Sequence, residues 1–316
     1  MRLNNFRKHV ILIVLNLLTV YSYSQNVYLR YYSLISKAET FNEQKKYLNS
    51  SLAYDSAFKV SAKYISQNDY YNAACSFALS NKIDAAFKAL TIIARQGKYA
   101  DYTHIAADSD LIPLHPDHRW NNLIETIKKN EVVVKAHFNY QLVEELNQIF
   151  VDDQKYRLQM DDSLVKYGFD SNPIKLIEKK MTIQDDEDLI KIAKIIDTYG
   201  WLGEDVIGHH GNKTIFIVIQ HADHATQMKY LPIMREAVKL RKANGSDLAY
   251  LEDRVAIDQG KKQIYGTQIH TNQSGKDSIL PIDDEINVDV RREALGMEPL
   301  EIYALSFKIK YVLPKN

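Results

Sequence analysis

Small and aromatic residues recur at helical spacing through the first part of this 316-residue chain. In the clearest segment, two such stretches flank the short polar turn Ser80-Asn81-Lys82. Ala74 and Ala86 let two helices approach closely, while Phe77 and Leu90 fill the space between them. The pattern therefore predicts an antiparallel helical hairpin.

A weaker copy of this hairpin lies 36 residues earlier, with Ala38, Phe41, Tyr54 and Ala57 in equivalent positions. In its small and aromatic positions the segment resembles the tetratricopeptide repeat (TPR) family. The family's opening tryptophan and closing proline are absent, and the spacing exceeds the family's own. The resemblance implies either a concave groove for a peptide or protein partner, or a short helical support for the rest of the chain.

Residues 101–127 resemble the divergent end that follows such repeats, and we expect them to cap a TPR-like domain over residues 25–130. A terminal unit of a repeat array must cover the last apolar face. The apolar residues suited to this are Leu111, Leu114, Trp120, Leu123 and Ile127. Cys75 lies among small residues, so we expect it to be a buried packing residue.

The first 24 residues have the pattern of a secretory signal peptide. Three basic residues among the first eight precede an eleven-residue apolar stretch, and Ser22-Tyr23-Ser24 fits a small-x-small cleavage site. The stretch is shorter than the roughly 20 residues that span a bilayer. Gln25 stands where a lipoprotein would have cysteine. We therefore expect an exported protein, periplasmic or secreted, with no stable membrane anchor after cleavage and no lipid attachment.

Composition narrows the function classes. With 46% hydrophobic and 25% charged residues the chain is an ordinary globular protein. The 40 basic and 40 acidic residues give no net charge, which argues against nucleic acid as a partner. The single cysteine excludes an intramolecular disulfide framework, a four-cysteine zinc site and a CxxC redox pair.

The second half is expected to form a mostly helical domain over residues 137–316, after a charged connection at residues 131–136. Periodicity and caps predict helices ending near Met160 and over residues 189–199, 224–242, 247–257 and 288–295. The apolar stretch around residues 214–219 fits a helix or a strand, and we favour a helix. Residues 263–269 alternate like a strand and are expected to pair with residues 278–282 through a turn at residues 272–275. The fold class is therefore mainly α: TPR-like hairpins followed by a mostly helical α+β domain with one β-hairpin.

Several polar residues in this half are of types that bind ligands or transfer protons. Spacings of three and four residues on a helix bring Gln220, His221 and His224 together. His221 is the candidate general acid or base, with Asp253 as the carboxylate that orients it. The candidate ligand-binding residues supply amide, carboxylate, guanidinium and phenol groups: they are Gln220, Asp223, Arg254, Gln263, Tyr265, Gln268 and Arg292.

Each candidate also has a structural interpretation. His221 follows an apolar run and fits a core histidine that bonds to the backbone, and Asp223 fits a helix N-cap. Asp253 and Arg254 fit solvated charges on a helix face. His209-His210 has no spaced acidic or cysteine partner, so we expect no metal site. The sequence has no zinc-protease helix, nucleophile elbow, phosphate-binding loop or dinucleotide-binding turn, and it identifies no cofactor.

Three polar blocks follow one another in this half of the chain: Gln220-His221-Ala222-Asp223, Asp253-Arg254, and Tyr265-Gly266-Thr267-Gln268. As a set, with Gly200-Trp201 before them, they resemble an uncharacterised bacterial domain family over residues 140–305. The resemblance implies that residues 214–222 are helical and that the blocks line a polar pocket, but it supplies no reaction. We expect this domain to bind or process a small polar ligand by acid/base or hydrolytic chemistry. The alternative is a non-catalytic adaptor that binds a protein through the TPR-like groove.

Overall fold

The computed structural model describes residues 25–96, 99–168, 171–272 and 275–314, so the expected signal peptide lies outside the described residues. The chain divides into two compact units. The first comprises residues up to Val133 together with Glu298–Val312, and the second comprises Val134–Met297 with the last four residues. Each unit has its own apolar core. Within the described residues, no helix has both the length and the apolarity needed to cross a membrane.

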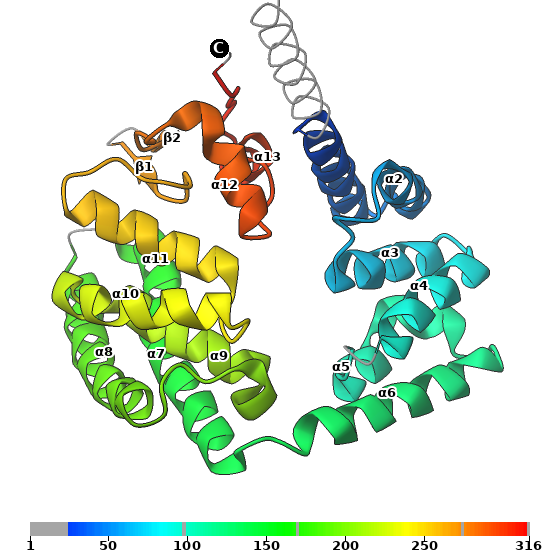
Figure 1. Ribbon diagram of the computed structural model, residues 1–316, viewed down its shortest axis with the longest axis horizontal. Coiled ribbons are helices and arrows are strands. Elements are labelled where there is room, and N and C mark those ends of the chain that lie inside the picture. The colour runs from blue at the N-terminus through cyan, green and yellow to red at the C-terminus, as the bar shows by residue number, and fades with distance from the viewer. Residues whose placement is uncertain (1–24, 97–98, 169–170, 273–274, 315–316) are drawn as a thin grey trace, which may run out of the picture. The chain divides into compact units, whose positions relative to one another are not determined.

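The first unit is helical (Figure 1). A helix over residues 25–43 is followed by α2 (Tyr47–Val60), α3 (Gln67–Leu79), α4 (Ile83–Arg95), α5 (Tyr102–Ala107), the 3-10 helix η1 (Ser109–Leu114), α6 (Arg119–Lys135) and, near the end of the chain, α13 (Leu300–Ser306). The expected connection at residues 131–136 is wrong for all but its last residue, since residues 131–135 are helical. The segment contains no glycine or proline that would end a helix. α6 therefore continues to Lys135, although valine is a weak helix former.

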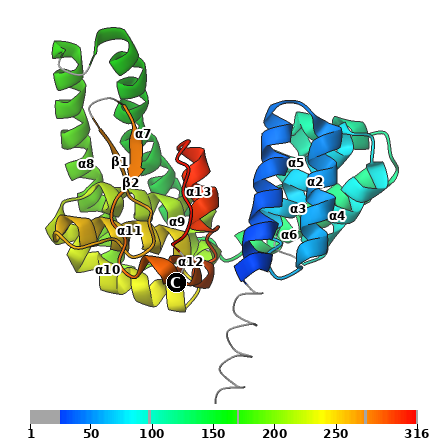
Figure 2. The ribbon, with the colours of Figure 1, turned by 90° about the horizontal axis from the view of Figure 1, so that it is seen from above.

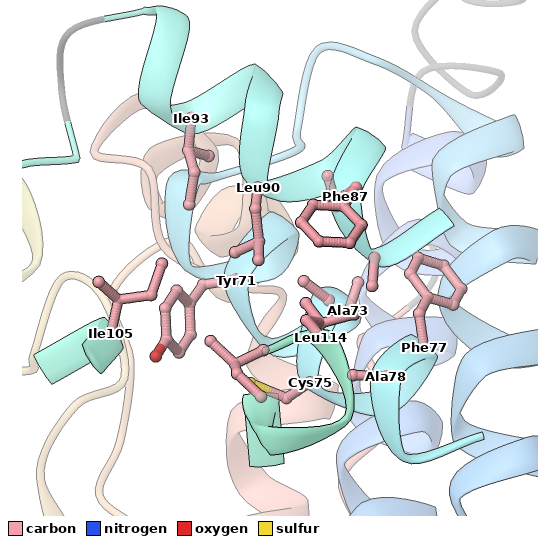
Figure 3. Close-up of a cluster of buried hydrophobic side chains, with 14 of the residues drawn as sticks. Tyr71, Ala73, Cys75, Phe77, Ala78, Phe87, Leu90, Ile93, Ile105 and Leu114 are labelled. Carbon is pink, nitrogen blue, oxygen red and sulfur yellow. The ribbon is translucent and has the colours of Figure 1, made fainter. Parts of the chain in front are cut away.

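The predicted hairpin is formed by α3 and α4. Ala74, Ala86 and Leu90 have no exposed surface, and Phe77 is 3% exposed. Figure 3 shows Leu90 and Phe87 of α4 pointing toward α3, with Phe77 at the end of the cluster. Small residues thus allow the close approach and large ones fill the gap, as the spacing predicts.

The five apolar residues expected to cap this unit are all buried in the same core. Beside them, Asp108 caps η1 by accepting a hydrogen bond from the Asp110 backbone amide, and it also accepts one from the Tyr71 hydroxyl at 2.7 Å. Cys75 is buried as expected, and its thiol faces Asp108. Burial raises the pKa of this thiol, so Cys75 stays a protonated packing residue.

The second unit is also helical, with one small sheet. Its elements are α7 (Tyr140–Tyr167), α8 (Asn172–Tyr199), α9 (Glu204–His221), α10 (His224–Lys239), α11 (Gly245–Asp258), β1 (Ile269–Thr271), β2 (Asp277–Ile279), the 3-10 helix η2 (Glu285–Asn287) and α12 (Val288–Ala294). The fold class is confirmed: the chain is mainly α with one β-hairpin.

The helices α7 and α8 run side by side as a long antiparallel pair (Figure 2). The sequence predicts helices that are too short here, ending near Met160 and starting near Leu189. Pro173 stands in the first turn of α8, where its fixed φ and missing N–H are tolerated, so it marks a start that periodicity alone does not give. The helix predicted over residues 214–222 is confirmed as the second part of α9.

Short turns join α9, α10 and α11, so the chain reverses its direction after α9 and again after α10. α9 and α11 are therefore parallel. α9 is kinked at Gly208, where φ is +71°. The side-chain amide of Asn212 donates to the carbonyl oxygens of Leu202 and Lys242 at 2.7 Å each. Asn212 thus joins the turn before α9 to the turn after α10.

The β-hairpin is present but shorter than predicted. Ile269 pairs with Ile279 and Thr271 with Asp277, in antiparallel register. Residues 263–268 are not part of the strand, although their apolar and polar positions alternate. Gln263 forms a single parallel bridge with Ile282, but Gly266 has φ of +78° and the backbone amides of Ile264, Tyr265 and Thr267 turn toward a buried carboxylate instead of a neighbouring strand. The two central residues of the expected turn, Gln273 and Ser274, lie outside the described residues.

The packing of the α3–α4 hairpin can be tested with Ala86→Leu. Three added carbon atoms have no room at a position with no exposed surface, so we expect the free energy of unfolding of the protein to fall by about 2 kcal/mol. The control Lys88→Leu lies on the exposed side of the same helix and should change it by less than about 0.5 kcal/mol. Equal effects of the two substitutions, measured by urea denaturation, would contradict this packing.

Candidate functional site

His221 ends α9 and contacts a buried carboxylate. Its Nδ1 lies 3.1 Å from Oδ1 of Asp153, which is on α7 and only 2% exposed. The imidazole itself is half-buried, with 27% of its side chain exposed. A carboxylate at Nδ1 holds the proton on that nitrogen and leaves Nε2 as the basic atom. Within the described part of the chain, no hydrogen bond is formed by Nε2.

Asp153 is held in place by its own neighbours. The amide of Gln154 donates to Oδ2 of Asp153 at 2.6 Å, and the guanidinium of Arg157 lies 3.3 Å from Oδ1. Arg157 also forms a bidentate pair with Asp185 of α8, with distances of 2.9 and 3.0 Å. Groups from α7 and α8 thus hold the buried carboxylate in place independently of His221.

Asp153, Asp185 and His221 offer three donor atoms that lie within 4.8 Å of one another, the spacing of a metal site. The Arg157 guanidinium bonds to Asp185 and lies against Asp153, so it occupies the space between the two carboxylates and offsets one of their two charges. A cation would have to displace Arg157. We therefore interpret this group as a histidine with a carboxylate partner, and the expectation of no metal site stays a prediction.

Several buried polar atoms near His221 have no hydrogen-bond partner in the described part of the chain. They are Oε1 of Gln220, Oε1 of Gln227, Nε of Arg254 and Nδ1 of His224, the last of which lies 3.6 Å from a carboxylate oxygen of Asp258. The Gln227 amide nitrogen donates to the carbonyl oxygens of Gln220 and Ala222, both at 3.0 Å, so its two hydrogens are used. This fixes the amide orientation and leaves Oε1 as the unpaired atom. Buried polar atoms in folded proteins normally have partners, so this cluster is a candidate ligand contact.

The register of two parallel helices places Gln220 and Arg254 at the same level. Lys213 of α9 bonds to Asp247 of α11 at 2.7 Å. Two turns further along, about 10 Å on each helix, the corresponding residues are Gln220 and Arg254. The first and second of the three sequence blocks therefore meet at the carboxyl end of α9.

Asp253 does not orient His221, so this part of the sequence prediction is wrong. Its carboxylate has no exposed surface and accepts hydrogen bonds from the backbone amides of Ile264, Tyr265 and Thr267 at 2.6, 2.9 and 2.9 Å. The Thr267 hydroxyl donates a fourth bond at 2.8 Å. Both oxygens are fully used, which makes Asp253 the clamp that holds the loop over residues 263–268 against α11.

Three other predicted ligand-binding residues also hold this loop. The Gln263 side chain donates to the carbonyl oxygens of Gln268 and Leu280 and accepts from the Gln268 amide. The Gln268 side chain donates to the Tyr250 carbonyl oxygen and to the Thr267 hydroxyl. Arg292, 1% exposed, donates to the carbonyl oxygen of Tyr265 at 2.8 Å. These contacts explain the residue types without a ligand.

Tyr265 turns its phenol toward the acidic side chain of Glu252, which also pairs with Arg235. Burial first, and then the Glu252 charge, raise the pKa of the Tyr265 phenol above its ordinary value. The phenol therefore stays protonated at physiological pH and acts as a hydrogen-bond donor.

Asp223 occupies the N-cap position of α10. Its Oδ1 accepts a hydrogen bond from the Thr226 amide at 2.7 Å. The bonds from Thr226 hold the pKa of this carboxyl below its ordinary value. The helix cap thus accounts for Asp223, as the alternative sequence interpretation holds.

Sequence reasoning misses Asp153, the partner of His221. The signal for it is present: Leu142, Leu146, Ile149 and Asp153 occupy one face of α7, and an acid at an otherwise apolar position is unusual. It also misses Gln227, which follows the first block by one helical turn. Neither position can be joined to His221 without knowing how α7, α9 and α10 pack.

The clamp formed by Asp253 can be tested by Asp253→Asn. The amide keeps the shape but has one acceptor oxygen, and its NH2 group faces backbone donors. We expect the free energy of unfolding to fall by about 3 kcal/mol, measured by urea denaturation. Asp258→Asn, on an exposed part of the same helix, should cost less than about 0.5 kcal/mol. A loss at Asp253 no larger than at Asp258 would show that the clamp contributes nothing.

The cap formed by Asp223 predicts a pH dependence. Its folded pKa is lowered, so its stabilisation is present above about pH 4, the ordinary range of an aspartate, and is lost as pH falls through the folded pKa. Thermal melts of Asp223→Ala should show a lower Tm than the wild type at pH 7, with a difference that shrinks in acid. Asp223→Asn keeps a cap oxygen and cannot titrate, so it should melt near the wild type at pH 7. A difference that is constant from pH 7 to pH 2 would refute the assignment.

Comparison with known proteins gives one match. The model of a family of unknown function, DUF6624, matches residues 140–314, which contain His221, the Asp253 clamp and all three sequence blocks. No curated protein and no solved structure matches this chain. Because the match covers more than half of its length, the chain belongs to DUF6624, a family of unknown function.

Proposed function

We propose that the second unit binds and chemically processes a small polar ligand at the carboxyl end of α9, with His221 as the proton acceptor or donor. The observation that carries this proposal is the pairing of a half-buried histidine with a fully buried aspartate, next to buried amide oxygens that have no partner among the described residues. A purely structural histidine needs no such unpaired neighbours.

Asp153 is the positioning residue in this proposal. Its carboxylate fixes the His221 ring and stabilises the imidazolium that forms when Nε2 takes a proton. Arg157 and Gln154 contact Asp153 and hold its carboxylate in place. The pair supplies acid/base or hydrolytic chemistry without a cysteine nucleophile, since the chain's one cysteine is buried in the other unit.

The unpaired atoms indicate the chemistry of the ligand. Gln220 and Gln227 present acceptor oxygens, and the Arg254 Nε presents a donor. A molecule that fits both has at least one N–H or O–H group and one carbonyl or anionic oxygen. Amides, amino acids and hydroxy acids have this combination.

The first unit is proposed to be a TPR-like array that supports the second unit or binds a peptide or protein partner. The α3–α4 hairpin and its small buried residues favour this interpretation. Export to the periplasm or the exterior is proposed from the basic and apolar pattern of residues 1–24. A non-catalytic adaptor is the alternative. This alternative predicts that deletion of residues 25–130 abolishes binding of the partner protein, and that substitution of His221 has no effect on function.

The proposal is tested by screening small polar metabolites for stabilisation of the protein in thermal melts and for turnover by mass spectrometry. We expect Arg254→Ala to weaken ligand binding. His221→Ala should keep binding and lose turnover by about a hundredfold or more. Asp153→Asn should lower kcat with little change in KM, which a merely structural role would not do.

The control is Lys229→Ala, which removes an exposed charge on α10 that is paired with Asp197. It should keep both binding and turnover. A turnover that His221→Ala retains in full would refute the catalytic role. Equal affinities of the wild type and Arg254→Ala would refute the location of the site.

A further inference from the structure

The second unit has a hollow at the end of α9 opposite to His221. It is a groove of about 430 Å³ between the end of α8, the turn that follows it, and the second half of α10. Tyr199 and Trp201 form one side, and Pro232, Ile233 and Leu240 form the other. This volume is within the range of about 300–1,000 Å³ typical of small-molecule sites.

The walls of this groove are held by buried polar contacts. Asn212, 3% exposed, donates to the Leu202 carbonyl oxygen on one wall and to the Lys242 carbonyl oxygen on the other. Gly200 ends α8 with φ of +71°, a conformation that favours glycine, and so turns Trp201 inward. The groove is therefore a preformed feature of the fold, because its two sides cannot separate without breaking the Asn212 bonds.

The lining is mostly apolar and partly open to solvent. Tyr199 is 56% and Leu240 59% exposed, although both are large apolar side chains. Contiguous exposed apolar surface is unfavourable in water and commonly marks a binding site. Trp201 adds an unsatisfied donor: its buried Nε1–H has no acceptor in the described part of the chain. Buried indole N–H groups normally have a partner.

One charged side chain at the groove, a lysine, forms no ion pair with the described residues. Glu236 pairs with Lys239, whose Nζ lies 3.2 Å from its Oε2. Lys242 has no ion-pair partner among the described residues. The stem of Lys242 passes close to Gly203, where an added Cβ would lie 3.4 Å from Cγ of Lys242 and would also contact the Asp205 carboxylate. The groove therefore combines an apolar wall with an exposed ammonium group that forms no ion pair with the described residues.

We propose that this groove binds a small amphipathic organic anion, whose apolar body lies against Trp201, Ile233 and Leu240 and whose anionic group pairs with Lys242. The site is separate from the one at His221. Asn212 and His221 are nine residues apart on α9, about 14 Å along its axis. The proposal does not depend on the proposed catalytic function, since it uses none of the same side chains.

The test uses two fluorescent probes with the full chain: the anion 8-anilinonaphthalene-1-sulfonate and the uncharged N-phenyl-1-naphthylamine. We expect saturable binding of the anionic probe at one site, with tighter binding than that of the neutral probe. Lys242→Glu should raise the Kd of the anion about tenfold and leave the neutral probe nearly unchanged. Leu240→Asp should weaken both, because it removes apolar wall and adds negative charge.

Matched controls are available on exposed positions. Lys180→Glu makes the same charge change on α8 outside the lining of the groove, and Leu158→Asp makes the same apolar change on α7. Neither should change the Kd by more than about twofold. The chain has two tryptophans, so energy transfer to the bound probe in Trp120→Phe reports on Trp201 alone.

Three results would overturn the proposal. One is the absence of saturable binding of the anionic probe, and another is binding that Lys242→Glu and Lys180→Glu weaken equally. The third is a bound probe that receives no excitation from Trp201. All the substituted lysine and leucine side chains are exposed, so a failure to fold does not complicate these outcomes.

Discussion

The second unit depends on the pairing of each buried carboxylate with its own cation or set of hydrogen-bond donors. Removing an ionised acid from water costs several kcal/mol unless charges or hydrogen bonds replace the lost solvation. Asp253 is satisfied by the loop over residues 263–268, Asp247 by Lys213, Glu252 by Arg235, and Asp153 by Arg157 and His221. Because each acid needs its partner, these contacts set which helices and loops can lie together. The first unit has a different basis, with alanine and tyrosine packing around its helical hairpin.

This constraint explains how the three sequence blocks divide their roles. Asp253 and the block that begins at Tyr265 hold the loop over residues 263–268 in place. The Asp253 carboxylate oxygens are fully occupied by these hydrogen bonds. His221 and Arg254, in contrast, each have a polar atom with no hydrogen-bond partner in the described part of the chain. Residues that hold the fold and residues proposed to bind the ligand are thus neighbours in the same blocks, and only the packing distinguishes them.

The sequence predicts the fold class, the α3–α4 hairpin and the helical state of residues 214–222, because helical periodicity and small residues are local signals. It does not predict the loop over residues 263–268, where alternation imitates a strand and the deciding contact comes from Asp253 on another element. The same reason explains the wrong partner for His221. Asp153 lies 68 residues away in sequence, and nothing local distinguishes its pairing from the rejected one.

The central claim is that Asp153 holds the proton of His221 on Nδ1, so that Nε2 is free to act as a base. The most direct measurement is the tautomer of His221, read from a long-range 1H–15N NMR correlation spectrum of the labelled protein at a pH where the ring is neutral. The account predicts a protonated Nδ1 and an unprotonated Nε2, and a shift toward the other tautomer in Asp153→Asn. A proton on Nε2 in the wild type would contradict it, because that nitrogen could not then accept a proton from a ligand.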